Sequence, residues 1–166
     1  MKKILFICTG NTCRSPMAEA FLKAALAKDP QLSSNFSASS AGISVYPGDS
    51  ASSHSMNVML SEWKIDISGH TASAISEKKI YEAFIILTMT WQQKEFILSR
   101  FPEAIGKTYT LKEFAMNGQL HGDYMQDYTR GLDITDPYGS PIHLYSRCAL
   151  EIKAAVDKLA DIIKKS

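Results

Sequence analysis

Residues 4–18 read ILFICTGNTCRSPMA, and this stretch contains the main fold signal of the chain. ILFIC, residues 4–8, is an uninterrupted apolar run of the kind found in strands that are buried on both faces. Ser15 and Pro16 predict a helix start, because serine is a favoured N-cap and proline suits the first helical position. Apolar residues then follow at helical spacing: Met17, Phe21, Leu22, Ala25 and Leu26. The sequence therefore predicts a loop between a buried strand and a helix.

The same alternation of strand and helix signals continues along the chain. Further strands are predicted over residues 35–42, 83–89 and 107–111, and further helices over residues 51–63, 91–100 and 148–163. Residues 115–140 are rich in Gly, Asp and Tyr and predict a loop with room for one helical turn. Strands that alternate with helices favour an α/β fold, an open parallel sheet of four strands with helices on both faces, as in flavodoxin-like proteins. We expect a single domain over residues 1–166.

The composition argues against several classes of protein. Eighteen basic and seventeen acidic residues leave a net charge of +1, which gives no reason to expect nucleic acid or an anionic membrane as partner. The cysteines, Cys8, Cys13 and Cys148, are too few for a secreted disulfide framework. No apolar run has the length of a signal sequence or a transmembrane helix, and no His or Cys spacing suggests a metal site. We expect a cytoplasmic protein without metal or other cofactor, as a monomer or weak homodimer.

The loop after the first strand contains residues suited to binding phosphate. Ligands of open parallel sheets bind at the carboxyl ends of strands, and Cys8 ends the first strand. The backbone N–H groups that follow can form a concave nest for a tetrahedral oxyanion, and Gly10 is expected to relieve the steric limits on the tight curve. The Arg14 guanidinium adds a planar fork that matches two phosphate oxygens. A thiol in such positive surroundings ionises readily, so Cys8 is a candidate nucleophile toward phosphorus.

A displacement at phosphorus also needs a proton donor for the leaving group. Asp136 in ITDPYG, residues 134–139, is a candidate, because the proline after it keeps it out of a helix. Taken alone, Asp-Pro with a nearby Gly is an ordinary turn, and a cysteine at a strand end is often a small buried apolar residue. The position of the Cys8 loop between a buried strand and a helix start favours the functional interpretation.

On these residues the chain resembles the low-molecular-weight protein tyrosine phosphatases. Their N-terminal C-x5-R-S-P loop matches CTGNTCRSP, residues 8–16, and their late Asp-Pro matches DPYG, with the same order over nearly the whole chain. The resemblance implies Cys8 as the nucleophile that forms a phosphocysteine, Arg14 as the transition-state clamp, and Asp136 as general acid and then general base. It also implies a phosphate-binding loop made of Thr9, Gly10, Asn11, Thr12, Cys13, Arg14 and Ser15.

The resemblance also implies supporting roles. Ser15 would hydrogen-bond the departing thiolate. Other residues would hold the loop in its strained shape: Asn11, Ser40 in SAG and His70 in SGH. From the sequence alone, an exposed loop histidine is an equally good interpretation of His70. Cys13 matches a cysteine that traps the oxidised nucleophile as a reversible disulfide, although a small residue that packs the loop would look the same.

The rim of the loop is expected to select the substrate. Tyrosine-specific members of the family usually have Ile or Leu where this chain has Thr12, whereas the bacterial branch that dephosphorylates arginine has threonine. TLKEF at residues 110–114 and the MT-x-Q-x-K pattern at residues 89–94 also look like that branch. A hydroxyl suits the polar guanidinium of phosphoarginine better than a branched alkyl group does, and Asp136 is suited to accept its hydrogen bonds. We expect a protein phosphatase that prefers phosphoarginine.

Other interpretations remain open. Tyr138 stands where the arginine branch has phenylalanine, and Tyr46 and Tyr138 are equally suited to stack on a phosphotyrosine ring. Arsenate reductases of the same fold share the C-x5-R loop, but they relay electrons through further cysteines that residues 71–120 lack. Cysteine phosphocarrier domains also place a thiol on a phosphate loop, but they need neither Arg14 nor Asp136. Phosphotyrosine is the first alternative, and the two other activities are more distant ones.

Overall fold

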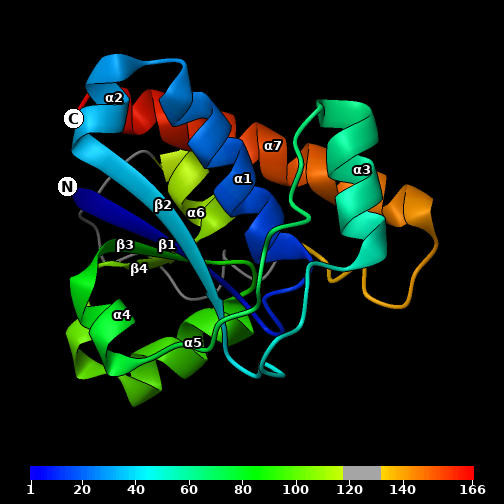
Figure 1. Ribbon diagram of the computed structural model, residues 1–166. Helices are drawn as coiled ribbons and strands as arrows, with labels where there is room; N and C mark the ends of the chain where they lie inside the picture. Colours follow the sequence, from blue (N-terminus) through cyan, green and yellow to red (C-terminus); the bar gives the residue numbers. More distant parts are fainter. Residues whose placement is uncertain (118–131) are drawn as a thin grey trace.

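Four parallel strands form one sheet in the computed structural model, which describes residues 1–117 and 132–166 (Figure 1). The strands are β1 (Lys2–Cys8), β2 (Phe36–Gly42), β3 (Ala83–Thr88) and β4 (Thr108–Thr110), and their order in the sheet is β2-β1-β3-β4. Cys8 of β1 pairs with Gly42 of β2, and Ile7 pairs with Thr88 of β3. Because all pairs are parallel, the carboxyl ends of the strands meet at one edge of the sheet. The predicted fold class is confirmed, and the predicted strand ends lie within about two residues of those observed.

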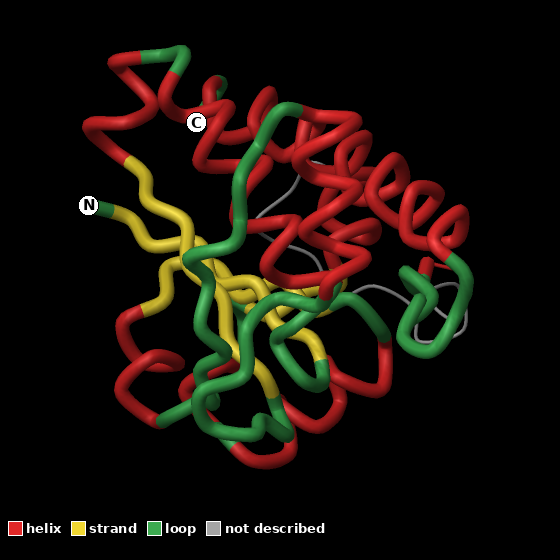
Figure 2. Tube along the Cα trace, turned by 45° about the vertical axis from the view of Figure 1, so that its right-hand side comes forward, coloured by secondary structure: helices red, strands yellow, loops and turns green. Residues whose placement is uncertain are grey.

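Helices cover both faces of the sheet (Figures 1 and 2). One face carries α1 (Arg14–Ala27), α2 (Pro30–Asn35), α3 (Ser53–Trp63), α6 (Leu111–Asn117) and α7 (Ile142–Lys164). The other carries α4 (Glu77–Glu82), α5 (Trp91–Arg100) and the 3-10 turn Pro102–Ala104. Within the described ranges, no helix is long and apolar enough to cross a membrane.

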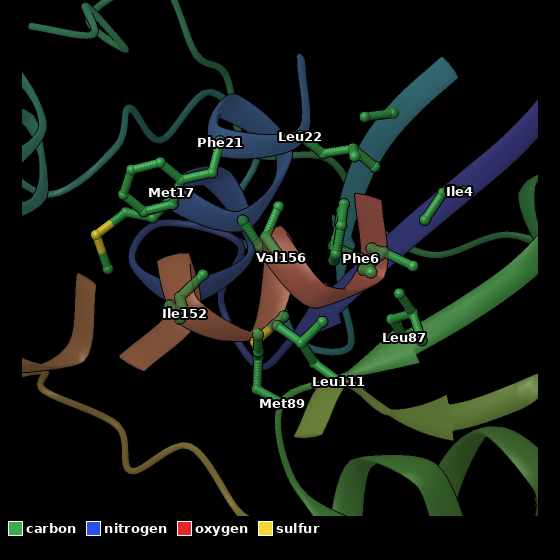
Figure 3. Packing of buried hydrophobic residues seen from close by; sticks show 14 of the residues in the cluster. Ile4, Phe6, Met17, Phe21, Leu22, Leu87, Met89, Leu111, Ile152 and Val156 are labelled. Carbon is green, nitrogen blue, oxygen red and sulfur yellow. The ribbon is translucent and has the colours of Figure 1, made fainter. Parts of the chain in front are cut away.

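Two apolar clusters hold the helical layers to the sheet. Side chains of β1 alternate between them, because successive residues of a strand point to opposite faces. Ile4 and Phe6 pack on the α1 and α7 side, whereas Leu5 and Ile7 pack on the α4 and α5 side. Figure 3 shows the larger cluster, in which side chains from β1, α1 and α7 interlock. This two-sided burial explains why residues 4–8 form a continuous apolar run.

The start of α1 differs from the prediction. The helix begins at Arg14 with Cys13 as its N-cap, and no side chain caps it. Ser15 therefore lies inside the first turn, and its Oγ is 2.9 Å from Cys8 Sγ and 2.8 Å from Asn11 Nδ2. Pro16 is tolerated there because the N–H groups of the first turn have no partner within a helix. The Ser15 hydroxyl thus contacts the loop and does not cap the helix.

Other differences concern short elements and element ends. Helices α2 and α4, of six residues each, follow the N-caps Asp29 and Ser76 and are too short to show a periodic apolar stripe. The last helix begins at Ile142, before the stripe that predicted it from Cys148 onward. The greater part of the predicted loop 115–140, residues 118–131, lies outside the described residues.

Helix α6 was not predicted, and its residues 111–117 overlap the end of the predicted strand at residue 111 and the predicted loop from residue 115 onward. It starts with reciprocal hydrogen bonds between Thr110 and Glu113: the Glu113 N–H donates to Thr110 Oγ1 at 3.2 Å, and the Thr110 N–H donates to Glu113 Oε2 at 3.0 Å. A threonine followed three residues later by glutamate is a capping-box signal, so this helix start was visible in the sequence.

Candidate active site

A cavity of about 330 Å³ opens at the sheet edge where the parallel strands end. Its walls come from three distant parts of the sequence: the loop after β1, the segment after β2, and the turn before α7. The lining residues are Cys8, Thr9, Gly10, Thr12, Cys13, Arg14, Ser44, Tyr46, Asp49, Asp136 and Tyr138. The structure thus brings together the predicted nucleophile, arginine, acid and rim residues. Ser44 and Asp49 were missed, because nothing in the sequence distinguishes them from ordinary polar loop residues.

Hydrogen bonds hold the loop after β1 by its carbonyl groups. The carbonyls of Cys8, Thr9 and Thr12 accept hydrogen bonds of 3.1, 2.9 and 2.8 Å from backbone N–H groups of the segment 43–52. The N–H groups of residues 9–13, by contrast, donate to no acceptor in the described part of the chain. Because its carbonyls are bound from outside and its N–H groups are unpaired, this loop has N–H groups free to donate to a bound anion.

Asn11 holds this loop in its bent conformation. It is fully buried, and its φ of 56° lies in the left-handed region, which asparagine tolerates better than most residues. Its Nδ2 donates to Ser15 Oγ at 2.8 Å and to Ser40 Oγ at 2.9 Å, and its Oδ1 accepts from the Ser73 N–H at 2.9 Å. The Asn11 carbonyl oxygen is 2.7 Å from His70 Nε2. The predicted loop-support residues therefore lie in one hydrogen-bond network.

Gly10 does not have the steric role that was predicted for it. Its φ is not positive, and a Cβ at this position would meet its nearest atom, Thr12 Oγ1, at 3.6 Å, which is an ordinary contact. The crowded glycine is Gly42 at the end of β2, where a Cβ would lie 2.7 Å from the Thr9 carbonyl oxygen and 3.0 Å from Asn11 Cβ. The sequence pattern could not reveal this approach, because it joins segments that are distant in the chain.

Arg14 connects the loop to the turn before α7. Its guanidinium is buried, with Nη1 donating to the Ile134 carbonyl at 2.9 Å and Nη2 lying 3.3 Å from Asp136 Oδ2. Asp136 Oδ1 accepts from the Tyr138 N–H at 3.1 Å, which is the side-chain turn expected of Asp-Pro. The Asp136 side chain is 48 % exposed, so its carboxylate is accessible from the cavity. A buried cation and an accessible carboxylate thus lie side by side.

Cys8 and Cys13 are both free buried thiols, but their surroundings differ. Cys8 Sγ has Ser15 Oγ at 2.9 Å. Cys13 Sγ lies 3.4 Å from Ser52 Oγ and 3.8 Å from the Tyr145 hydroxyl. Burial, and the contact with Cys13, raise the pKa of Tyr145 to about 12, so this phenol is neutral at physiological pH.

The predicted specificity residues line the outer part of the cavity. Tyr46 and Tyr138 are 78 % and 77 % exposed although both border it, and the half-buried Thr12 borders it as well. Two exposed aromatic rings and a hydroxyl give this entrance both apolar and hydrogen-bonding surface. Within the described ranges, no three His, Cys, Asp or Glu side chains are placed to hold a metal ion.

Two side chains behind the loop were missed in the sequence. Gln93 of α5 donates from Nε2 to Thr9 Oγ1 at 3.2 Å, and Glu19 of α1 accepts from Ser40 Oγ at 2.5 Å. Glu19 looks like an ordinary polar site on a helix, and the spacing of Thr90 and Gln93 is a capping-box signal that indicates only a helix start. Only the packing of the helices against the sheet places them beside the loop.

The two stretches that resemble the arginine-specific branch contact each other. Lys94 of the MT-x-Q-x-K pattern lies 2.9 Å from Glu113 of TLKEF, and the two side chains are only 12 % and 7 % exposed. Neither residue borders the cavity. The ion pair joins α5 to α6, so this part of the resemblance reflects helix packing.

Comparison with known proteins places this geometry in a family. Residues 3–166 match the family described as low molecular weight phosphotyrosine protein phosphatase. A protein-arginine-phosphatase of Geobacillus stearothermophilus is 40 % identical over 159 residues, which are 96 % of this chain and 94 % of that protein. Among solved structures, a tyrosine phosphatase from T. tengcongensis is 37 % identical with a TM-score of 0.81 over all of both chains. A YwlE arginine phosphatase mutant with a phosphorylated active-site serine is 34 % identical, with a TM-score of 0.84 over 99 % of this chain and 97 % of that one. The chain therefore belongs to the low molecular weight phosphotyrosine protein phosphatase family.

Proposed function

We propose that this protein is a cysteine-dependent protein phosphatase that hydrolyses phosphoarginine through a phosphocysteine intermediate. The observation that carries the proposal is the loop between Cys8 and Arg14, in which the N–H groups of residues 9–13 have no acceptor among the described residues. Such a nest, closed by a buried guanidinium, is suited to hold a tetrahedral phosphoryl group against a thiol. The similarity to a protein-arginine-phosphatase supports phosphoarginine as the substrate.

The geometry supports a two-step mechanism. Cys8 Sγ attacks phosphorus, the bond to the leaving group breaks, and Asp136 gives that group its proton. Ser15 Oγ, 2.9 Å from Cys8 Sγ, stabilises the thiolate before and after the transfer. Arg14 has five N–H donors, and those not used by Ile134 and Asp136 remain for the phosphate oxygens. Asp136 then takes a proton from the water that attacks the phosphocysteine, which releases phosphate and the Cys8 thiolate. The phosphorylated serine of the related YwlE mutant supports a covalent intermediate.

The entrance of the cavity supports phosphoarginine as the preferred substrate. Thr12 presents a hydroxyl there, and the accessible carboxyl group of Asp136 keeps an oxygen that is suited to accept a hydrogen bond from a guanidinium. Phosphotyrosine is the second candidate, because the exposed rings of Tyr46 and Tyr138 are suited to pack on a phenyl ring.

We extend the proposal to the context of the enzyme. Residues 1–166 act as one domain, as a monomer or weak homodimer, on phosphorylated proteins of the cytoplasm, where thiols are kept reduced.

Cys13 protects the nucleophile. When peroxide has oxidised Cys8 to a sulfenic acid, the Cys13 thiol displaces water to form a disulfide, which cellular thiols then reduce.

The test compares turnover of one peptide sequence that carries either phosphoarginine or phosphotyrosine. We expect kcat/KM for phosphoarginine to be at least about tenfold higher, and a preference for phosphotyrosine would select the second candidate. Cys8→Ser should abolish turnover of both peptides while inorganic phosphate still binds. Turnover by this variant would reject the cysteine mechanism.

A further inference from the structure

Gln93 is a buried side chain that connects the start of α5 to the loop after β1. It is 6 % exposed. Its Oε1 accepts from the N–H groups of Met89 and Thr90 at 2.9 and 3.1 Å, and its Nε2 donates to Thr9 Oγ1 at 3.2 Å. Its own backbone N–H donates to Thr90 Oγ1, which completes a capping box. One side chain therefore both caps α5 and holds a residue of the cavity wall.

The surroundings of Gln93 determine which way its amide points. Backbone N–H groups only donate, so the end of the amide that meets two of them is the oxygen. The other end is the NH2 group, which donates to the Thr9 hydroxyl. This bond occupies a lone pair of Thr9 Oγ1 and leaves the hydroxyl hydrogen for another acceptor. Within the described residues Thr9 Oγ1 has no second partner, and Thr9 borders the cavity beside Cys8.

We infer that the Thr9 hydroxyl donates a hydrogen bond to the bound phosphoryl group, and that Gln93 is the positioning residue that directs its hydrogen there. The inference rests on the proposed function, because it requires an oxyanion in the cavity. A hydroxyl whose oxygen is already hydrogen-bonded from behind is pre-oriented, so it loses little rotational freedom when the anion binds. Thr9 thereby contributes a side-chain donor to the nest in addition to its backbone N–H.

Gln93→Glu reverses the direction of the hydrogen bond between residue 93 and the Thr9 hydroxyl, and it keeps the hydrogen bonds at the start of α5. One carboxylate oxygen still accepts from Met89 and Thr90, and glutamate suits a capping box as well as glutamine does. The other oxygen now accepts from the Thr9 hydroxyl and turns its hydrogen away from the cavity. We expect the inhibition constants of inorganic phosphate and orthovanadate to rise at least about tenfold, because a hydrogen bond to a charged group is lost. Gln92→Glu, at an exposed position of α5, adds the same charge and should change both constants less than about twofold.

Thr9 variants separate this role from a general effect on packing. Thr9→Val removes the hydroxyl and should weaken binding of both anions about tenfold. Thr9→Ser keeps a hydroxyl, so it should bind both anions as the wild type does, with an unchanged melting temperature. Gln93→Glu should raise the two inhibition constants less in the Thr9→Val background than in the wild type, because the hydroxyl whose hydrogen it turns away is absent. If Thr9→Val binds both anions as tightly as the wild type, the inference is overturned. A wild-type protein that binds neither anion would instead overturn the proposed function.

Discussion

At Gly42 the end of β2 approaches the loop so closely that no side chain fits. A Cβ there would lie 2.6 Å from Val45 Cγ2 and 2.7 Å from the Thr9 carbonyl oxygen. We predict that Gly42→Ala displaces the loop, lowers the free energy of unfolding by about 1–3 kcal/mol, and lowers kcat/KM for phosphorylated peptides. Urea titration and steady-state kinetics measure both effects. Gly69→Ala is the control, because a Cβ there meets no atom within 4 Å. Equal behaviour of the two variants would contradict the prediction.

The choice of substrate is also argued at the scale of one residue. Thr12→Ile replaces a hydroxyl on the cavity wall by an alkyl group, so it should favour an aromatic leaving group over a guanidinium. We expect the ratio of kcat/KM for phosphoarginine to that for phosphotyrosine to fall at least about tenfold. Thr12→Ser keeps the hydroxyl and should leave this ratio close to that of the wild type. An unchanged ratio in Thr12→Ile would show that other residues set the preference.

Between elements, the buried ion pair of Lys94 and Glu113 joins α5 to α6. Lys94→Met leaves the Glu113 carboxylate without its cation in a site where the side chain is 7 % exposed. We predict that this change lowers the free energy of unfolding by about 3 kcal/mol. Adding Glu113→Gln should recover most of the loss, because it removes the uncompensated charge. Chemical denaturation of both variants tests this, and a cost below about 1 kcal/mol for Lys94→Met would mean that the pair behaves like a surface ion pair.

The elements also differ in how well the sequence predicted them. Strand β1 and helix α7 have long local patterns, an apolar run and an amphipathic stripe, and both were predicted. Helix α6 was missed although Thr110 and Glu113 form a capping box at its start. The start of α1 was misplaced, because a serine before a proline suits an N-cap, whereas Ser15 is bonded to Cys8 and Asn11. A local rule fails where a tertiary contact takes the same side chain.

At the scale of the whole molecule, α7 buries titratable groups against the rest of the fold. Burial raises the pKa of the Cys148 thiol to about 12, and the pKa of Tyr145 is shifted in the same direction. In the unfolded chain a thiol titrates near about 8.5, so above that pH the unfolded state has lost a proton that the folded state keeps. The folded state is therefore favoured less as the pH rises from about 8.5 to 12, whereas below about 8.5 this contribution is fully present.

We predict that the free energy of unfolding falls between about pH 9 and pH 11, with a slope of up to about 1.4 kcal/mol per pH unit from Cys148. The free energy of unfolding of Cys148→Ala should fall less steeply with pH, because this variant lacks the thiol that titrates differently in the folded and unfolded states. Urea titrations of both proteins across this pH range measure the difference. Parallel curves would mean that the Cys148 thiol titrates alike in the folded and unfolded states.

The sequence by itself determined the α/β class, the four strands, the longer helices, and the candidacy of Cys8, Arg14 and Asp136. Strand and helix periods are set by the backbone geometry of each element, so they can be seen in a short window of residues. The spacing of Cys8 and Arg14 is likewise local, since one loop contains both.

Only the tertiary structure decided how the loop is held. The carbonyls bound by the segment 43–52, the tight approach of Gly42, and the reach of Gln93 to Thr9 all join residues that are far apart in the chain. Their separations depend on how helices and strands pack, which no periodicity encodes. For the same reason, the unusual backbone conformation that was expected at Gly10 was found at Asn11. Four hydrogen bonds hold this residue: one to Ser15, one to Ser40 of β2, and two to the loop that contains His70 and Ser73.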